Sequence, residues 1–455
     1  MNKEKSARAI KLLNIGHYLV TVLSFLLVFA YTIQLGPRES RYYFYVTAFY
    51  GILLYLLDRT YNAYLVGFMS AGDMAYSQSL SCTLSITGIY AATALAWTRF
   101  YNPVPFLLLL LGQVICNIIW SKLITWTYFK MIPPQKTAVL YRTHGDLLRI
   151  EEIKENPRKF RLSAFIQEEK LWGDFRTVLS GYEALFVIGI DAALRNSIAQ
   201  YCVEEKVDGY FLPDVGDVIL AGARHIQSYS VPVLNVERKK PVVEFLFIKR
   251  VFDIFASLVG LVIGSPFMLI TALAIKLYDG GPVFYTQTRL TRDEKVFRMI
   301  KFRSMCVDAE KDGVARLTTE NDDRITPVGK VIRAVRMDEL PQLINILKGE
   351  MSVVGPRPER PEIAEQYAEE FPAFRLRLQV KAGLTGYAQV YGRYNTDPHD
   401  KLEMDMMYIN KMGIFTDLML IFGTLRILFV KESTSGISRG HITASVSETG
   451  EEDEL

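Results

Sequence analysis

The sequence predicts a membrane protein of the α plus α/β class. Its expected parts are an N-terminal four-helix transmembrane bundle, a small Rossmann-like α/β domain, and a C-terminal domain with a re-entrant membrane helix hairpin. Long apolar runs crowd the first third of the chain, which favours a bundle. Short apolar strands alternate with polar helical stretches in the middle. A further apolar run with positive charge at both ends opens the last part.

Composition and charge narrow the class of protein. Of the 455 residues, 50% are hydrophobic and 12% aromatic, which is rich for a soluble protein. The net charge is only +3 and no basic block stands out, so we expect no nucleic-acid partner. The four cysteines have no metal-ligand or CxxC spacing and should be reduced. They are Cys82, Cys116, Cys202 and Cys306.

The N-terminal part should cross the membrane four times. The run Leu12–Leu35 has no Lys, Arg, Asp or Glu, and about 20 apolar residues suffice to cross a bilayer. The flank before it holds four Lys or Arg and one Glu, which predicts a cytoplasmic N-terminus and an uncleaved helix. The expected helices of this domain, residues 1–132, are about 12–35, 42–57, 80–97 and 104–129. A buried helical bundle in a soluble protein is the alternative.

Residues 133–240 should form a cytoplasmic, Rossmann-like α/β domain. Runs at 137–142, 184–190, 209–213 and 231–236 are typical of strands, and polar helical stretches separate them. After the first strand the chain reads RTHGDL, with one glycine where a dinucleotide site has GxGxxG. We therefore expect a scaffold, dimerisation or regulatory role rather than nucleotide binding.

A fifth apolar run, Val251–Leu277, should enter and leave the membrane on the same side. Lys249 and Arg250 precede it, and translocating cationic flanks is disfavoured. Pro266 should break or kink the helix, and Ser265 can donate its hydroxyl to the carbonyl that proline leaves free. A kinked spanning helix is the alternative.

Two further segments complete the predicted organisation. The run Ile414–Val430 contains Asp417 and Arg426 and should lie on the membrane surface as an amphipathic helix. Residues 436–455 form an acidic tail, for which the composition predicts disorder.

The chemistry gathers between residues 279 and 393. Lys301 and Arg303 alternate along a probable strand, so both should face one side. Arg357 is held between prolines in a GPRP turn, and Arg393 follows a glycine. These cations predict an anion site of the kind that binds phosphates.

The pair Asp338-Glu339 opens a short apolar run and should begin a helix, where the macrodipole keeps both carboxylates ionised. One acid would then serve as nucleophile and the other as ligand to Mg²⁺. Ordinary helix capping is the alternative explanation for such a pair.

The surroundings decide between these readings. The motifs KFRSM, VDAE, RITPVGKVIR, MDELPQLINILKGEMSVVGPRPE and AGLTGYAQV follow in order. Over roughly residues 245–435, within an expected catalytic domain at 241–435, the chain resembles the bacterial sugar transferase family, the monotopic-type polyprenol-phosphate phosphoglycosyl transferases. The preceding helices and α/β domain are similar to the large form that primes capsule or exopolysaccharide synthesis. Tyr387 departs from the tryptophan of many members.

The resemblance implies a function and a set of roles. A sugar 1-phosphate would pass from a UDP-sugar to undecaprenyl phosphate at the cytoplasmic face of a bacterial inner membrane. Asp338 would attack the sugar-bearing phosphorus and release UMP, and Glu339 would ligate Mg²⁺. Phosphate-binding roles would fall to Lys301, Arg303, Arg357, Gln389 and Arg393, and the helix break of the hairpin to Ser265-Pro266.

The expected cargo is glucose or galactose 1-phosphate, although the sequence does not identify the sugar. A homodimer and downstream glycosyltransferases are the expected protein partners. A catalytically decayed scaffold or regulator of polysaccharide assembly is the alternative function. A multi-spanning transporter is disfavoured because the predicted spans carry no charge pair.

Overall fold

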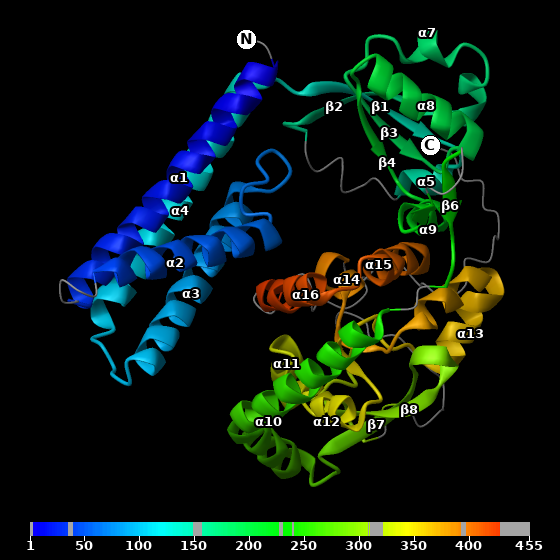
Figure 1. The fold of residues 1–455 in the computed structure, drawn as a ribbon. Helices are drawn as coiled ribbons and strands as arrows, with labels where there is room; N and C mark the ends of the chain where they lie inside the picture. Colours follow the sequence, from blue (N-terminus) through cyan, green and yellow to red (C-terminus); the bar gives the residue numbers. More distant parts are fainter. Residues whose placement is uncertain are drawn as a thin grey trace. The chain divides into compact units, whose positions relative to one another are not determined.

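The computed structural model describes residues 3–34, 40–148, 157–226, 231–238, 241–307, 309, 322–392 and 397–427. The chain divides into two compact units, Met1–Leu212 and Pro213–Leu455. Figure 1 labels the elements of both.

Four helices open the first unit at the predicted positions. They are α1 (Lys3–Thr32), α2 (Arg41–Thr60), α3 (Ala71–Ala96) and α4 (Val104–Met131). Their apolar residues form a shared core, in which the buried rings of Phe25 and Tyr50 stack at 4.0 Å. By length and composition α1, α3 and α4 could each cross a membrane, and so could α10 in the second unit. The shorter α2 carries Arg41, Asp58 and Arg59 at its ends, and its crossing remains a prediction.

A parallel four-stranded sheet follows in the same unit. Its strands are β1 (Gln135–Tyr141), β2 (Phe160–Gln167), β3 (Ala184–Ile188) and β4 (Asp208–Phe211), in the order β2-β1-β3-β4. The accompanying helices are α5 (His144–Leu148), α7 (Phe175–Leu179) and α8 (Ala192–Glu204), with a 3₁₀ turn η1 (Glu168–Leu171). The small parallel sheet is as predicted. Strand β2 was not predicted, because the predicted strands were short apolar runs and this edge strand mixes apolar with polar residues.

The predicted strand at 231–236 is not part of this sheet. Strand β6 (Val233–Asn235) pairs antiparallel with β5 (Arg224–Ile226), and both belong to the second unit. Helix α9 (Val215–Ala221) joins them there because its Val215 and Val218 pack into the core of that unit. The alternation of strands and helices alone could not show that the sheet ends at β4.

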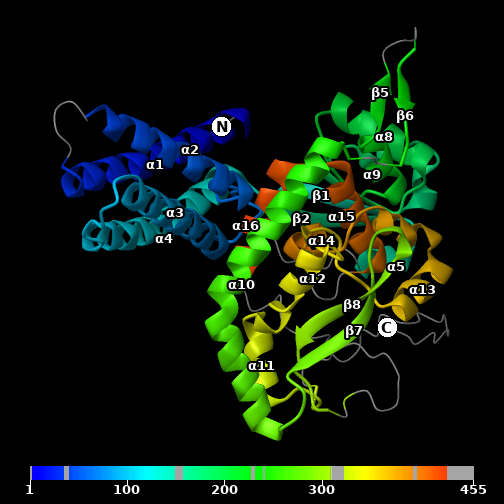
Figure 2. The ribbon, with the colours of Figure 1, turned by 60° about the horizontal axis from the view of Figure 1, so that its bottom comes forward.

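Helix α10 (Val243–Asp279) is a single 37-residue helix with Pro266 inside it. It runs along one side of the second unit and changes direction partway (Figures 1 and 2). Pro266 has no N–H to donate to the carbonyl of Val262. Ser265 Oγ donates to that carbonyl instead, at 2.8 Å, which confirms the predicted hydroxyl contact. The helix is continuous through this position, and the predicted break into a hairpin is not seen.

The rest of the second unit is a set of short elements beside α10. They are β7 (Phe284–Leu290), η2 (Arg292–Glu294), β8 (Val296–Phe302), α11 (Pro327–Ala334), η3 (Met337–Glu339), α12 (Gln342–Lys348), β9 (Ser352–Val354), α13 (Pro361–Glu370), η4 (Pro372–Gln379), β10 (Gly383–Thr385), α14 (Tyr387–Tyr391), α15 (Pro398–Asn410) and α16 (Ile414–Ile427). Strands β7 and β8 form an antiparallel hairpin, and β9 pairs parallel with β10.

Polar contacts join the first turns of α10 to the elements beside it. Arg250 donates to the carbonyls of Ile346 and Leu347 at the end of α12, at 2.6 and 2.7 Å. The buried Asp253 accepts from Ser352 Oγ and from the Val353 N–H. Lys249 pairs with the buried Asp417 of α16 at 2.5 Å. The cations that looked like a membrane flank therefore also hold α10 to the rest of the unit.

Candidate active site

Asp338 and Glu339 do not begin a helix. They form the 3₁₀ turn η3, and helix α12 starts only at Gln342 after the N-cap Pro341. Arg336, just before the turn, has a positive φ of 53° in the left-handed region, which is strained for a residue other than glycine. The helix macrodipole is therefore not what governs these acids, and the charges of nearby side chains decide their state.

Three cations surround Glu339. Its Oε1 lies 3.3 Å from Arg357 Nη2, 3.7 Å from Arg336 Nη1 and 4.0 Å from Lys301 Nζ. The Glu339 side chain is only 12% exposed, so solvent screens these contacts weakly. Asp338, in contrast, makes no hydrogen bond or ion pair with any residue that the structure describes.

This asymmetry separates the proton affinities of the two acids. Burial and the neighbouring Glu339 charge together raise the pKa of Asp338 to about 6, against the opposing effect of nearby cations. Burial alone would raise the pKa of Glu339 as well, but the three cations outweigh it and lower that pKa to about 2. Two neighbouring carboxylates with divergent pKa values are typical of sites where each has a different task.

Lys301 and Arg303 take different partners. Lys301 extends from β8 toward Glu339, and burial lowers its pKa to about 8 against the attraction of that carboxylate. The buried Arg303 pairs with Asp279 at the end of α10 and leaves no room for a side chain at Gly281. The structure thus brings Lys301 to the acidic pair, whereas Arg303 ties the end of β8 to α10.

Four consecutive carbonyls hold the segment that presents Arg357. Pro356 O accepts from Gly383 N–H, and Arg357 O accepts from Arg377 Nη2, both at 2.9 Å. Pro358 O accepts from Arg289 Nη1 at 3.1 Å, and Glu359 O accepts from Leu290 N–H at 3.0 Å. We call residues 355–359 the arginine arm. Prolines stiffen it, but these contacts from three other segments place it.

Glycines let the backbone beneath the arm pack closely. A Cβ at Gly383 would lie 2.1 Å from Gly355 N, and a Cβ at Gly355 would lie 2.3 Å from Lys381 O. Neither position has room for a side chain, because the colliding atoms belong to the backbone. The two glycines explain why the GPRP and AGLTG motifs occur together.

Arg377 is a site residue that the sequence did not reveal. Its side chain is 3% exposed, and it contacts Asp405 Oδ2 at 2.7 Å and Glu359 Oε1 at 3.5 Å in addition to the Arg357 carbonyl. It lies in a segment that reads FRLRLQ, with no motif to distinguish it from a surface arginine. Only the fold shows that it joins α15 to the arginine arm.

Asn345 is a second site residue that was not predicted, because it lies in the short apolar run after the acidic pair. Its Nδ2 donates to the Arg298 carbonyl at 2.8 Å, and its Oδ1 accepts from the Ile300 N–H at 3.0 Å. The side chain is fully buried. These bonds fix α12, and with it the acidic pair, in register with the strand that carries Lys301.

The remaining predicted site residues lie elsewhere or outside the described residues. Gln389 donates to the Leu384 carbonyl at 2.9 Å, and its Oε1 is buried without a partner among the described residues. Ser265 and Pro266 lie within α10. Arg393 lies outside the described residues.

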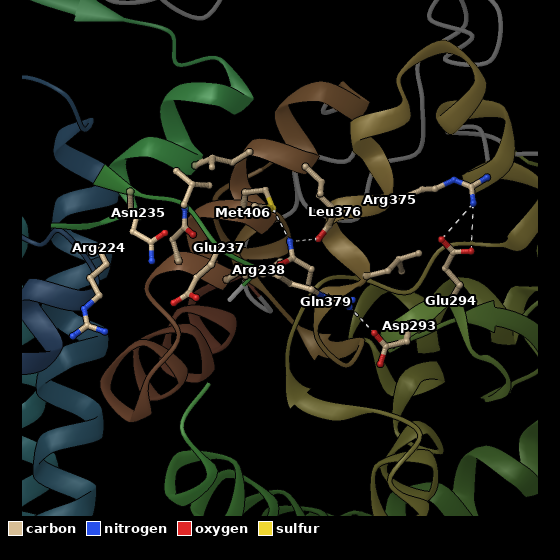
Figure 3. Close-up of a pocket in the computed structure, with 17 residues that line it drawn as sticks. Arg224, Asn235, Glu237, Arg238, Asp293, Glu294, Arg375, Leu376, Gln379 and Met406 are labelled. Carbon is tan, nitrogen blue, oxygen red and sulfur yellow. Dashed lines mark hydrogen bonds and ion pairs between the residues drawn. The ribbon is translucent and has the colours of Figure 1, made fainter. Parts of the chain in front are cut away.

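A separate cavity of about 960 Å³ opens among α9, the β5–β6 hairpin, η4 and α15 (Figure 3). Two ion pairs cross its wall, Arg238–Asp293 and Arg375–Glu294. No predicted site residue lines it, so the candidate active site is the acidic pair with its cations.

Replacing Arg377 by Ala should destabilise the protein by about 3–5 kcal/mol, because Asp405 and Glu359 would be left buried without their partner. Burial already raises the pKa of Asp405. Without Arg377 both carboxyls should have folded-state pKa values above the unfolded ones, which costs stability as pH rises between those values. The loss of stability caused by Arg377→Ala should therefore be smaller at acid pH.

Thermal unfolding of the detergent-solubilised protein from pH 4 to 8 measures this. Arg375→Ala is the matched control: its pairs with Glu294 and Glu365 are about half exposed, and the change should cost less than about 1 kcal/mol. A deficit for Arg377→Ala that does not vary with pH would contradict the assignment.

Residues 244–431 match the family model described as bacterial sugar transferase. A UDP-N-acetylgalactosamine-undecaprenyl-phosphate N-acetylgalactosaminephosphotransferase of Aeromonas hydrophila is 43% identical over 185 residues, 40% of this chain and 44% of that protein. A UDP-glucose:undecaprenyl-phosphate glucose-1-phosphate transferase of Klebsiella pneumoniae is 37% identical over 249 residues, 53% of each chain.

The matched part thus spans about half the length of these two relatives. A shorter relative is matched almost completely. The exopolysaccharide production protein PSS of Rhizobium leguminosarum bv. phaseoli is 42% identical over 200 residues, which are 42% of this chain and 98% of that protein. The shared region contains the acidic pair, its cations and the arginine arm, and this chain belongs to the bacterial sugar transferase family.

Proposed function

We propose that this protein transfers a sugar 1-phosphate from a UDP-sugar to undecaprenyl phosphate, the priming step of a surface polysaccharide. The observation that carries the proposal is the Asp338 carboxylate, which has no partner among the described residues, beside a Glu339 held by three cations. Names of relatives support the reaction class, since they include glucose, galactose and N-acetylgalactosamine phosphotransferases. They differ in the sugar, so glucose or galactose 1-phosphate remains the expected cargo.

Asp338 is the proposed nucleophile. A carboxylate oxygen attacks the phosphorus that bears the sugar, and the bond from that phosphorus to the bridging oxygen breaks, so UMP leaves with the electron pair. The product is a phosphosugar ester on Asp338. In the second step an oxygen of undecaprenyl phosphate attacks the same phosphorus, and the bond to Asp338 breaks. The carboxylate is restored, and the kinetics are ping-pong.

Lys301 and Arg357 are the proposed ligands of the diphosphate. Both already approach an anion, Glu339 Oε1, and both come from segments that other contacts hold in place. Preorganised cations stabilise the charge that develops as UMP leaves, without reorganisation at the moment of reaction. The intact pair and its cations disfavour the alternative of a decayed scaffold.

The donor set at this pair fits Mg²⁺. Each cation makes its closest contact with Glu339 Oε1, so Oε2 is the oxygen that would ligate the ion. No group of three acidic, histidine or cysteine side chains suited to a metal occurs in the described part of the chain. Phosphate oxygens and water would complete the shell, as Mg²⁺ prefers. When bound, the ion would neutralise diphosphate charge.

The proposal also covers the location of the protein in the membrane and its protein partners. The protein would lie in the bacterial cytoplasmic membrane with the acidic pair on the cytoplasmic face and α10 entering and leaving one leaflet. A lipid acceptor with its phosphate at the interface requires a site at headgroup depth. Downstream glycosyltransferases would extend the lipid-linked sugar, and the α/β domain would support a homodimer.

A panel of UDP-sugars tests the reaction. With one of them, the protein and undecaprenyl phosphate should release UMP, and without the acceptor the donor should leave labelled phosphosugar on the protein. Asp338→Asn should abolish both the turnover and the label. Wild-type turnover in that variant would rule out Asp338 as nucleophile.

The first step should follow a bell-shaped pH profile. Asp338 attacks only when ionised, so the rate rises with pH through its pKa of about 6. Lys301 binds phosphate only when protonated, so the rate falls above its pKa of about 8. Single-turnover UMP release from pH 5 to 10 measures both limbs. Lys301→Arg should move the alkaline limb upward, and an unchanged limb would remove Lys301 from this role.

Glu339→Gln should raise the Mg²⁺ concentration needed for half-maximal UMP release by about tenfold or more, because one ligand oxygen loses its charge. A Mg²⁺ titration at saturating UDP-sugar measures the shift, with Glu369→Gln, at an exposed position of α13, as control. A wild-type titration curve for Glu339→Gln would exclude it as the metal ligand.

Cysteine labelling tests the topology. Thr288, exposed on β7, should react as cysteine only from the cytoplasmic side in a variant without the native cysteines. Arg99, exposed after α3, should react as cysteine from the outside if all four helices cross. Labelling of residue 288 from outside would instead mean that α10 spans the membrane.

A further inference from the structure

Helix α11 links the lipid-facing helix to the acidic pair. Its Val328 and Ile332 lie in one apolar cluster with Met268, Ala272 and Ile275 of α10. Most of α10 is exposed in this structure: only 11% of its most apolar 18-residue stretch is buried. Helix α11 ends at Ala334, four residues before Asp338. The end of α11 is thus the place where a membrane-facing element meets the proposed nucleophile.

Arg333, in the last turn of α11, differs from the other cations near the acidic pair. Its guanidinium makes no hydrogen bond or ion pair with the residues that the structure describes, whereas Lys301, Arg336 and Arg357 all approach Glu339. Its charge acts on Asp338 and on Asp322, but Asp322 is already paired with Arg324 at 2.6 Å. A partly buried guanidinium beside a carboxylate that must react needs an anion from elsewhere.

The cations near the acidic pair differ in whether they already approach an anion. Lys301, on β8, and Arg357, in the arginine arm, both approach Glu339 Oε1. Arg333 stands on α11, which packs against α10 in a cluster that also holds Phe302 of β8. With Lys301 and Arg357 assigned to the diphosphate of the donor, Arg333 is left for a second phosphate.

We propose that Arg333 binds the phosphate of the polyprenyl phosphate acceptor and positions it for the second step. This inference rests on the proposed function. The acceptor's attacking oxygen forms the new bond to phosphorus as the bond to Asp338 breaks. Arg333 donates hydrogen bonds to the two oxygens that do not attack and remains protonated throughout.

The two half-reactions test the proposal separately. In the first, UDP-sugar alone gives one burst of UMP and labels the protein. In the second, isolated labelled protein is chased with polyprenyl phosphate. Arg333→Gln should leave the burst within about threefold of wild type at pH 8, where Asp338 is ionised in the variant as well. The second step should slow, and the KM for the acceptor should rise, by about 10- to 100-fold.

Lys330→Gln is the matched control, since Lys330 is an exposed cation on the same helix and its loss should change neither step. A short, water-soluble prenyl phosphate is the second control. The Arg333→Gln defect should persist with it, because the contact is with phosphate. A defect confined to long-chain acceptors would make α11 a membrane anchor and overturn the proposal.

An equal loss in both half-reactions would also overturn it, as would an unchanged acceptor KM. Arg333→Lys should recover part of the acceptor affinity, because it keeps the charge but not the fork of donors. If the wild-type protein shows neither UMP release nor label, the proposed function itself fails, which is a different outcome from a defect limited to Arg333→Gln.

Discussion

The site depends on one contact, the one between Glu339 Oε1 and three cations from separate parts of the chain. Lys301 comes from a strand, Arg336 from the strained residue before η3, and Arg357 from the arginine arm. These cations keep Glu339 ionised, and its charge then helps to raise the pKa of its neighbour Asp338. Because like charges so close cannot both ionise easily, the two acids are driven apart in proton affinity.

Further contacts fix the segments that place these cations around Glu339. Arg357 could satisfy Glu339 from many backbone positions, but Arg377 holds its carbonyl and is itself buried between Asp405 and Glu359. Asn345 in turn fixes the position of Lys301 relative to the acidic pair, because it joins α12 to β8. If a diphosphate binds these cations as proposed, it would meet groups that do not need to be ordered first.

The same region is joined by polar contacts to α10, the helix that is expected to meet the membrane. Arg250 of α10 donates to a carbonyl near the end of α12, and Asp253 of α10 accepts from a backbone N–H of β9. Helix α11 packs against the C-terminal half of α10. In an apolar solvent such groups must find partners within the protein, which ties the acidic pair to α10 rather than leaving it on a flexible tether. Under the proposed function, the acceptor phosphate and Asp338 would then share one support.

The sequence by itself determined the order of the parts and identified the candidate site residues. Apolar runs located α1 to α4 and α10, because burial in lipid requires length and composition that are visible without a fold. The acidic pair, Lys301 and the GPRP turn were identifiable because their residue types are unusual at such spacing. The hydroxyl contact of Ser265 also followed from sequence, since its partner carbonyl is only three residues away.

Only the tertiary structure decided how these residues work together. It separated Lys301 from Arg303, moved the acids from a helix start to a 3₁₀ turn, and assigned β6 to a hairpin outside the sheet. It also revealed the contacts of Arg377, which lies in no motif, and of Asn345, and it showed that the Arg333 guanidinium has no partner among the described residues. The physical reason is that a side chain's charge state and task depend on partners distant in sequence, and folding alone brings those partners within a few ångströms.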